Sequence, residues 1–202
     1  PTLNYQPGDI AKLPVAYSEL QRDLIAKNAK IAIEISKLDW DIFETSSGFS
    51  QYPLAIKKSH ETLISESWSI HSNNLNQRTN ELRAIEIENN QILIDAYGLQ
   101  QELSSEVPES QITLALAERE KDGQRLISYI LGCMLGRYSL DEPGLIYAHA
   151  GNVGFEPGRY TTFPADADGI IPITDELWFF EDAPSRIREF LRAVWGADTL
   201  EE

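Results

Sequence analysis

The sequence predicts a mainly α-helical protein, with a long antiparallel helical hairpin followed by a smaller helical lobe that has irregular loops and at most two short strands. Two patterns predict the hairpin: a seven-residue apolar repeat runs through residues 63–103 without a proline, and a second amphipathic pattern covers residues 18–44. Glycines and prolines interrupt most of the remaining chain. The chain therefore divides into residues 1–17, the hairpin of residues 18–104 and the lobe of residues 109–202.

The longer helix of the hairpin carries apolar residues seven or fourteen positions apart, and a second set fills the intermediate spacings. The two sets are Trp68, Leu75, Leu82, Ala96 and Leu103, and Ile64, Ile85, Ile92 and Leu99. His71, Arg78 and Asn89 interrupt this stripe, and polar residues at such positions usually fix the register of a helix pair at some cost in stability. We therefore expect a helix over residues 56–97 with one specific partner, ended or bent at Gly98.

The shorter helix begins after Ser18, which is a suitable N-cap, and continues to Glu44 before the residues Ser46-Ser47-Gly48 stop it. Its apolar residues recur every three or four positions, and they are Leu20, Leu24, Ile31, Ile35, Leu38 and Ile42. Because the connection to the longer helix is short, the two helices should lie antiparallel, with Leu82 buried against the shorter one.

The lobe follows a break at the sequence Val107-Pro108-Glu109. Its central helix should have apolar residues around most of its circumference, and these are Leu126, Ile127, Ile130, Leu131, Met134 and Leu135. The expected elements of the lobe are a short helix at residues 112–117, the buried helix at 121–136 with Gly136 as its C-terminal cap, brief β-like runs at 145–148 and 170–173, and a closing helix between Pro184 and Gly196.

The composition indicates a soluble, globular chain that can bury a core, since 42% of its 202 residues are hydrophobic. Its longest apolar run, residues 126–135, is far shorter than the roughly 20 residues that a membrane span needs. The net charge of −15 is unevenly distributed: residues 1–58 are neutral, residues 59–120 carry −8 and residues 121–202 carry −7. This charge argues against a chain that grips DNA by itself, because binding the phosphate backbone requires lysine and arginine.

Candidate catalytic and metal-binding groups are sparse in the sequence. His60, His71 and His149 have no spacing with one another or with Cys133 that makes a zinc or catalytic cluster, and we expect Cys133 to be a small buried hydrophobe. The pattern Asp166-x-Asp168-Gly169 lacks the later ligands of a calcium loop and predicts a turn. We therefore assign no catalytic, cofactor-binding or metal-binding residue in this chain.

Several stretches spread along the chain have distinctive amino-acid sequences. They are T-L-N-Y-Q-P-G-D-I-A-K-L-P-V from Thr2, D-W-D-I-F-E-T-S from Asp39, L-N-Q-R-T-N-E-L from Leu75, I-L-I-D-A-Y-G-L from Ile92, L-I-S-Y-I-L-G-C-M-L-G-R-Y-S-L-D from Leu126, D-G-I-I-P-I from Asp168 and R-I-R-E-F-L from Arg186. Together they resemble the PglX family, the adenine-specific DNA methyltransferases of BREX phage-defence systems, and more distantly the type IIG restriction-modification enzymes. Since the chain also opens on Pro1 without a methionine, we expect an internal fragment of a longer protein.

The resemblance implies that residues 1–17 are the end of a target-recognition domain, because their pattern closes that domain in the family. It also implies a parent protein that is a site-specific adenine methyltransferase dependent on S-adenosylmethionine. The Asn-Pro-Pro-aromatic loop and the glycine-rich turn that this chemistry uses in the family are absent from residues 1–202. The fragment should therefore hold no cofactor and be inactive alone.

From these points we expect a non-catalytic helical spacer of an adenine-N6 DNA methyltransferase in a BREX-type phage-defence system. The alternative is a protein-interaction module that docks another subunit of the defence complex or a phage protein. DNA should be bound through the parent protein, and we expect no metal, no membrane and a cytoplasmic location. If the fragment itself contacts DNA, the expected contacts are to phosphates from Lys12, Lys57 and Lys58, which lie in the charge-neutral segment.

Overall fold

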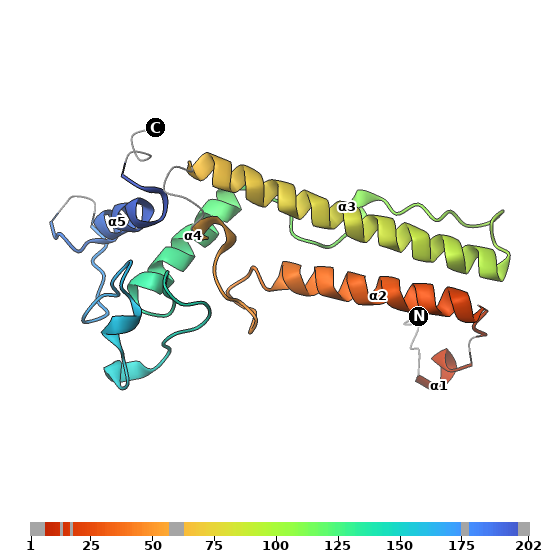
Figure 1. The fold of residues 1–202 in the computed structure, drawn as a ribbon, viewed down its shortest axis with the longest axis horizontal. Coiled ribbons are helices and arrows are strands. Elements are labelled where there is room, and N and C mark those ends of the chain that lie inside the picture. Colours follow the sequence, from red (N-terminus) through yellow and green to blue (C-terminus); the bar gives the residue numbers. More distant parts are fainter. Residues whose placement is uncertain (1–6, 13, 17, 57–62, 175–177, 198–202) are drawn as a thin grey trace, which may run out of the picture. The chain divides into compact units, whose positions relative to one another are not determined.

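The computed structural model describes residues 7–12, 14–16, 18–56, 63–174 and 178–197, and it is mainly α-helical as the sequence predicts. The elements in chain order are α1 (Pro7–Ile10), α2 (Glu19–Trp40), the 3-10 turn η1 (Pro53–Ala55), α3 (Ile64–Tyr97), η2 (Glu109–Gln111), α4 (Arg119–Met134), η3 (Ala150–Asn152), η4 (Pro157–Arg159) and α5 (Ala183–Trp195) (Figure 1). The described residues contain no β-strand, so the β-like runs at residues 145–148 and 170–173 do not pair.

The chain forms two compact units. Unit 1 comprises Pro1–Ile35 and Arg78–Thr113, and unit 2 comprises Ser36–Gln77 and Leu114–Glu202, so α2 and α3 each contribute residues to both units. The division into residues 1–17, 18–104 and 109–202 stays a prediction.

Unit 1 is built on the first part of α2 and the second part of α3, which lie side by side and antiparallel (Figure 1). The predicted N-cap of α2 is confirmed: Ser18 Oγ accepts a hydrogen bond from Gln21 N at 3.3 Å, and Gln21 Oε1 accepts one from Ser18 N at 2.8 Å. This reciprocal arrangement is a capping box, which satisfies two backbone donors at the start of a helix. Leu82 of α3 is buried, as expected, and its packing against α2 stays a prediction.

The helix ends and the buried faces differ in part from the prediction. Helix α2 ends at Trp40 and not at Glu44, and α3 begins at Ile64, whereas Ile56 is extended. Along the predicted stripe of α2, Ile35 is buried but Leu20 is 82% exposed. The apolar repeat therefore placed both helices correctly but overestimated how much of the stripe is covered.

The predicted short helix at residues 112–117 is wrong, because the structure has a 3-10 turn at η2 and no helix across those residues. In unit 2, Ala115 N donates to both carboxylate oxygens of Asp39, at 3.1 and 3.2 Å. An N–H committed to a side chain is not available for the backbone bond that propagates a helix. Asp39 is itself buried, so this contact holds the chain in place after it leaves η2.

The core of unit 2 is rich in aromatic rings and lies between α4, α5 and the segment around η1. Its buried members are Phe49, Tyr52, Leu54, Ala55, Leu126, Tyr129, Ile130, Cys133, Met134, Tyr138, Phe163, Phe190, Val194 and Trp195. Helix α4 contributes a single buried face, because Ile127 and Leu135 are 47% and 48% exposed. The expectation that apolar residues bury most of its circumference is therefore wrong, since Tyr129 and Cys133 supply part of the buried face instead.

Helix α4 ends in a Schellman motif, which confirms Gly136 as the C-terminal cap. Gly136 has a φ of 72°, Arg137 N donates to Gly132 O at 2.8 Å, and Gly136 N donates to Cys133 O at 3.1 Å. A side chain at Gly132 is excluded by the ring of Tyr138, since an added Cβ would lie 2.6 Å from its Cδ2 atom. The small residue at position 132 thus admits an aromatic ring that folds back on the helix, and not a second helix.

Helix α5 confirms the predicted closing helix at both ends. Asp182 is its N-cap and accepts a hydrogen bond from Ser185 N at 2.8 Å, and Gly196 follows its last residue with a φ of 93°. Hydrogen bonds from Ser185 hold the pKa of the Asp182 carboxyl below its usual value. Within the described residues, no helix is both long and apolar enough to cross a membrane.

Candidate functional site: a register lock in the helical pair

A partly buried polar contact joins the two helices of unit 1. Asn28 of α2 is only 4% exposed, and its side-chain amide donates to Glu88 Oε2 at 2.7 Å and to Asn89 Oδ1 at 3.1 Å on α3. Leaving a buried amide without a partner costs free energy, so this contact favours one alignment of the helices over those shifted by a turn. We call Asn28, Glu88 and Asn89 the register lock.

One of the three polar residues that interrupt the apolar stripe of α3, Asn89, belongs to the register lock. Asn89 interrupts the apolar stripe in the sequence, and the structure gives it a partner on the neighbouring helix, as expected for a residue that fixes pairing. His71 is buried and Arg78 is half-buried on the same helix, so the other two interruptions are also withdrawn from solvent.

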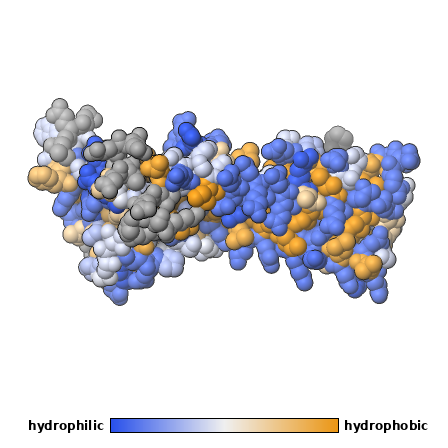
Figure 2. All heavy atoms as spheres, turned by 45° about the horizontal axis from the view of Figure 1, so that its top comes forward, coloured by the Kyte–Doolittle hydropathy of each residue, from blue (hydrophilic) through white to orange (hydrophobic). Residues whose placement is uncertain are grey.

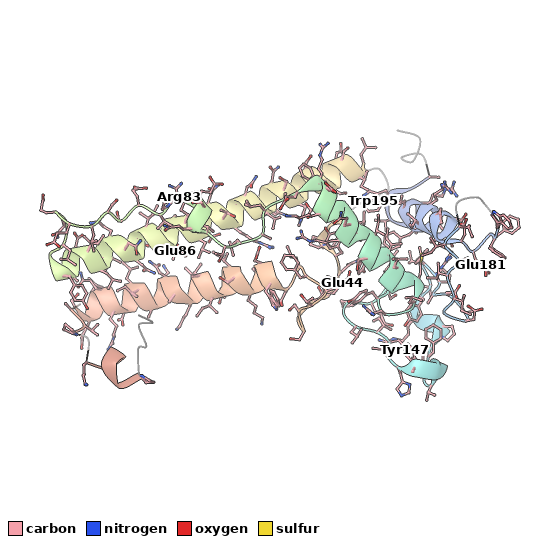
Figure 3. All side chains as sticks on the ribbon, turned by 180° about the vertical axis from the view of Figure 1, so that it is seen from behind. Glu44, Arg83, Glu86, Tyr147, Glu181 and Trp195 are labelled. Atoms are coloured by element: carbon pink, nitrogen blue, oxygen red, sulfur yellow. The ribbon has the colours of Figure 1, made fainter. Side chains whose placement is uncertain are left out.

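After α3 the chain turns back at Gly98 and runs along this helix as residues 99–113, which we call the return segment (Figure 1). Arg83, labelled in Figure 3, donates from Nε to Val107 O at 2.6 Å, and Asn90 Nδ2 donates to Ser105 O at 3.3 Å. Val107 itself is buried. Side chains of α3 therefore hold the backbone of the return segment, and unit 1 has a third layer beside its two helices.

The side chains that make the contacts of the register lock and hold the return segment are amides, a carboxylate and a guanidinium. None of these side chains is a hydroxyl or thiol nucleophile paired with a base. In unit 2, Cys133 is buried as predicted, and burial raises the pKa of its thiol to about 12, so the nucleophilic thiolate is not formed near neutral pH. Among the residues that the structure describes, no three His, Cys, Asp or Glu side chains are grouped to hold a metal ion.

Of the three lysines predicted to contact DNA phosphates, Lys12 lies within the described residues. Lys12 is exposed in the segment between α1 and α2, whereas Lys57 and Lys58 lie outside the described residues. The phosphate-contact assignment therefore stays a prediction. The Asp166 turn is confirmed, because its carboxylate accepts hydrogen bonds from the backbone N–H of Gly169 at 2.7 Å and of Asp168 at 3.1 Å.

Sequence reasoning missed Asn28 and Arg83, the residues that make the key contacts of unit 1. Asn28 carried a detectable signal, because it falls between Leu24 and Ile31 at the three- and four-residue spacing of the apolar stripe. A polar residue at that position of an apolar stripe indicates a contact that fixes the pairing of two helices, as Asn89 does on α3. Arg83 carried no such signal, since its partner is a backbone carbonyl 24 residues away.

Comparison with known proteins agrees with the resemblance found in the sequence. The chain is 40% identical over 221 aligned positions to the adenine-specific methyltransferase BrxX of Escherichia coli O9:H4 (strain HS). It is 33% identical over 207 positions to the adenine-specific methyltransferase PglX of Lacticaseibacillus casei (strain Zhang). The chain matches a region of BrxX and PglX.

Both matches include the whole chain, which spans 18% of the length of BrxX and 17% of the length of PglX. The expected similarity to PglX-type methyltransferases is therefore confirmed along all 202 residues. No protein-family model matches the chain.

Removing the Asn28 side chain tests how much the register lock stabilises the helical pair. Asn28→Ala should lower the free energy of unfolding by about 1–3 kcal/mol, because it removes both hydrogen bonds that the buried Asn28 amide donates to the half-buried Asn89 and to the charged Glu88. In a double-mutant cycle with Asn89→Ala, the two losses should fall short of additivity by about 0.5–1.5 kcal/mol. Chemical denaturation followed by circular dichroism measures both quantities, with Asn80→Ala, an exposed change on α3, as the control. Additive losses would mean that Asn28 and Asn89 do not interact.

Proposed function

We propose that this chain is a non-catalytic helical spacer within a site-specific adenine-N6 DNA methyltransferase of a BREX-type phage-defence system. The observation that carries the proposal is the register-locked helical pair of unit 1, in a chain that is similar throughout to a region of two adenine-specific methyltransferases. A pair of helices with one permitted alignment keeps a fixed length, as a spacer must. Random-coil connections lack this property.

In this proposal the parts of the chain have distinct tasks. Residues 1–17 end a target-recognition domain, residues 18–104 form the spacer, and residues 109–202 form a lobe that follows it. S-adenosylmethionine and the target adenine are bound by other regions of the methyltransferase, and the resemblance to PglX supports this assignment. Lys12, Lys57 and Lys58 supply at most weak contacts to phosphates, which together would steepen the salt dependence of DNA binding by only about two to three units.

The first experiment asks whether the chain has activity of its own. Residues 1–202 are incubated with radiolabelled S-adenosylmethionine and DNA, beside the complete methyltransferase as the positive control. We expect no methyl transfer from the 202-residue chain, because residues 1–202 lack the Asn-Pro-Pro-aromatic loop and the glycine-rich turn that this chemistry uses in the family. Methylation by this chain alone would overturn the assignment as a spacer.

The second experiment asks whether the rigidity of the helical pair matters. In the complete methyltransferase, α2 and the paired part of α3 are replaced by flexible glycine-serine segments of equal residue number, and methylation of site-containing DNA is measured. We expect a large loss of activity, since a flexible connection no longer fixes the recognition and catalytic parts in productive geometry. Full activity of the flexible version would exclude a spacer function and leave the chain as a passive or docking element.

A docking module is a second candidate, and one observation favours it. Ile33 is 67% exposed on α2 and lies about 140° around the helix from Asn28, so it faces away from the register lock. Leu20 is exposed as well, and Figure 2 shows apolar side chains among the polar ones on the surface of the helical pair. Under this alternative, Ile33→Ser should weaken co-purification with other subunits of the defence system, while the exposed change Ala29→Ser should not.

A further inference from the structure

Tyr97 occupies a well-fixed position at the end of α3. The helix closes there with a second Schellman motif, in which Gly98 N donates to Asp95 O at 3.2 Å and Leu99 N donates to Ile94 O at 2.9 Å. Gly98 adopts the left-handed conformation that this motif requires, with a φ of 67°. The backbone of Tyr97 is thus held by its own helix, independently of what its side chain touches.

The hydroxyl of Tyr97 binds the segment that leads into α2, more than 80 residues earlier in the chain. It donates to Pro14 O at 2.5 Å and accepts from Ala16 N at 3.2 Å. These two backbone groups flank Val15, whose side chain is 67% exposed. In an extended segment, such groups are the ones that a neighbouring strand would satisfy, and here a single hydroxyl satisfies both.

The capping box at Ser18 and Gln21 completes the attachment of this segment. Its two hydrogen bonds fix how the chain enters α2, and the Tyr97 hydroxyl fixes the chain two residues before Ser18. Pro14 adds stiffness, because its ring restricts φ and removes the N–H. Residues 14–16 and Ser18 are therefore fixed against the helical pair, within unit 1.

We propose that Tyr97 is a positioning residue, whose hydroxyl sets the direction in which the segment before α2 leaves the helical pair. This inference rests on the proposed function, in which that segment belongs to the target-recognition domain. Tyr97 then transmits the orientation of the spacer to the part of the methyltransferase that reads DNA. A phenylalanine at this position would keep the ring and its packing but lose both hydrogen bonds.

The direct test is amide hydrogen exchange in residues 1–202. Tyr97→Phe should raise the exchange rate of the Ala16 amide roughly fivefold, as expected for the loss of one hydrogen bond. The matched control is Tyr147→Phe in unit 2, which removes a hydroxyl that donates to Val153 O at 3.3 Å. That control should leave Ala16 unchanged, and an unchanged Ala16 rate in Tyr97→Phe would overturn the inference.

The functional test uses the same two variants in the complete methyltransferase. Tyr97→Phe should raise the KM for site-containing DNA by at least roughly threefold with little change in kcat, because orientation of the recognition part affects productive binding more than chemistry. Faster exchange at Ala16 with an unchanged KM would refute positioning while leaving the spacer function intact. Failure of the spacer function itself appears separately, as full activity of the version with flexible glycine-serine segments.

Discussion

Asp122→Ala should lower the free energy of unfolding by about 3–4 kcal/mol, one of the two largest losses that we expect from a single change. The carboxylate is completely buried at the start of α4. It accepts hydrogen bonds from Trp68 Nε1 at 3.1 Å, from Glu118 N at 3.0 Å and from the Arg125 guanidinium at 2.9 Å. Its removal leaves three donors without their acceptor, one of them a charged group that is partly withdrawn from water.

Urea denaturation of residues 1–202 measures this loss, and Glu120→Ala provides the matched control. Glu120 lies in the same first turn of α4 but is exposed, so its removal should change the free energy of unfolding by less than about 1 kcal/mol. Trp68→Phe should give an intermediate loss, because it removes one of the three donors and keeps an aromatic ring. Equal effects of Asp122→Ala and Glu120→Ala would show that the buried carboxylate is not a centre of stability.

Phe190→Ala should cost about 3–5 kcal/mol, because it empties the middle of the unit 2 core. The side chain of Phe190 has no exposed surface, and its ring makes edge-to-face contacts with Phe163 at 5.2 Å and with Tyr129 at 6.2 Å between centroids. Such contacts add to the free energy of burial. The packing is dense on several sides, so the cavity cannot close by a small shift of one neighbour.

Phe180→Ala is the matched control for this prediction, since Phe180 is 92% exposed and lies ten residues earlier in the chain. It should change the free energy of unfolding by less than about 0.5 kcal/mol. Thermal unfolding followed by near-ultraviolet circular dichroism compares the two variants. A midpoint that falls as far for Phe180→Ala as for Phe190→Ala would contradict the structure of this core.

The helices of the protein could be predicted from the sequence because their signals are local. The capping box at Ser18, the glycines at positions 98 and 136 and the proline at the start of α5 each act within one turn of the helix that they begin or end. Apolar repeats then indicated the approximate extent of each helix, although α2 ends at Trp40 and not at the predicted Glu44. The helix predicted at residues 112–117 does not form, because Ala115 N donates its hydrogen bond to the carboxylate of Asp39. These two residues are 76 positions apart, so the local sequence gives no sign of their contact.

The buried faces could be predicted only in part, because burial depends on the partner as well as on the helix. Leu20 and Leu135 fit the apolar stripes of α2 and α4 but remain exposed, since nothing within their own units covers them. The candidate site shows the same division: Asn89 was recognised as a polar residue in an apolar stripe, whereas its pairing with Asn28 required the structure. Periodicity identifies the stripe but does not identify the opposing residue.

The return segment has a consequence for which substitutions the chain tolerates. Arg83 and Asn90 hold it through the carbonyl oxygens of Val107 and Ser105, and every residue type presents that oxygen to a donor. Side-chain changes at the exposed Glu106 or the half-buried Ser105 should therefore leave the attachment intact, apart from the 3.7 Å ion pair between Arg83 and Glu106. Substitutions at Val107 are restricted by packing, because its side chain is buried. Sequence drift at the positions of this segment whose side chains are not buried can accordingly be wide without altering its path.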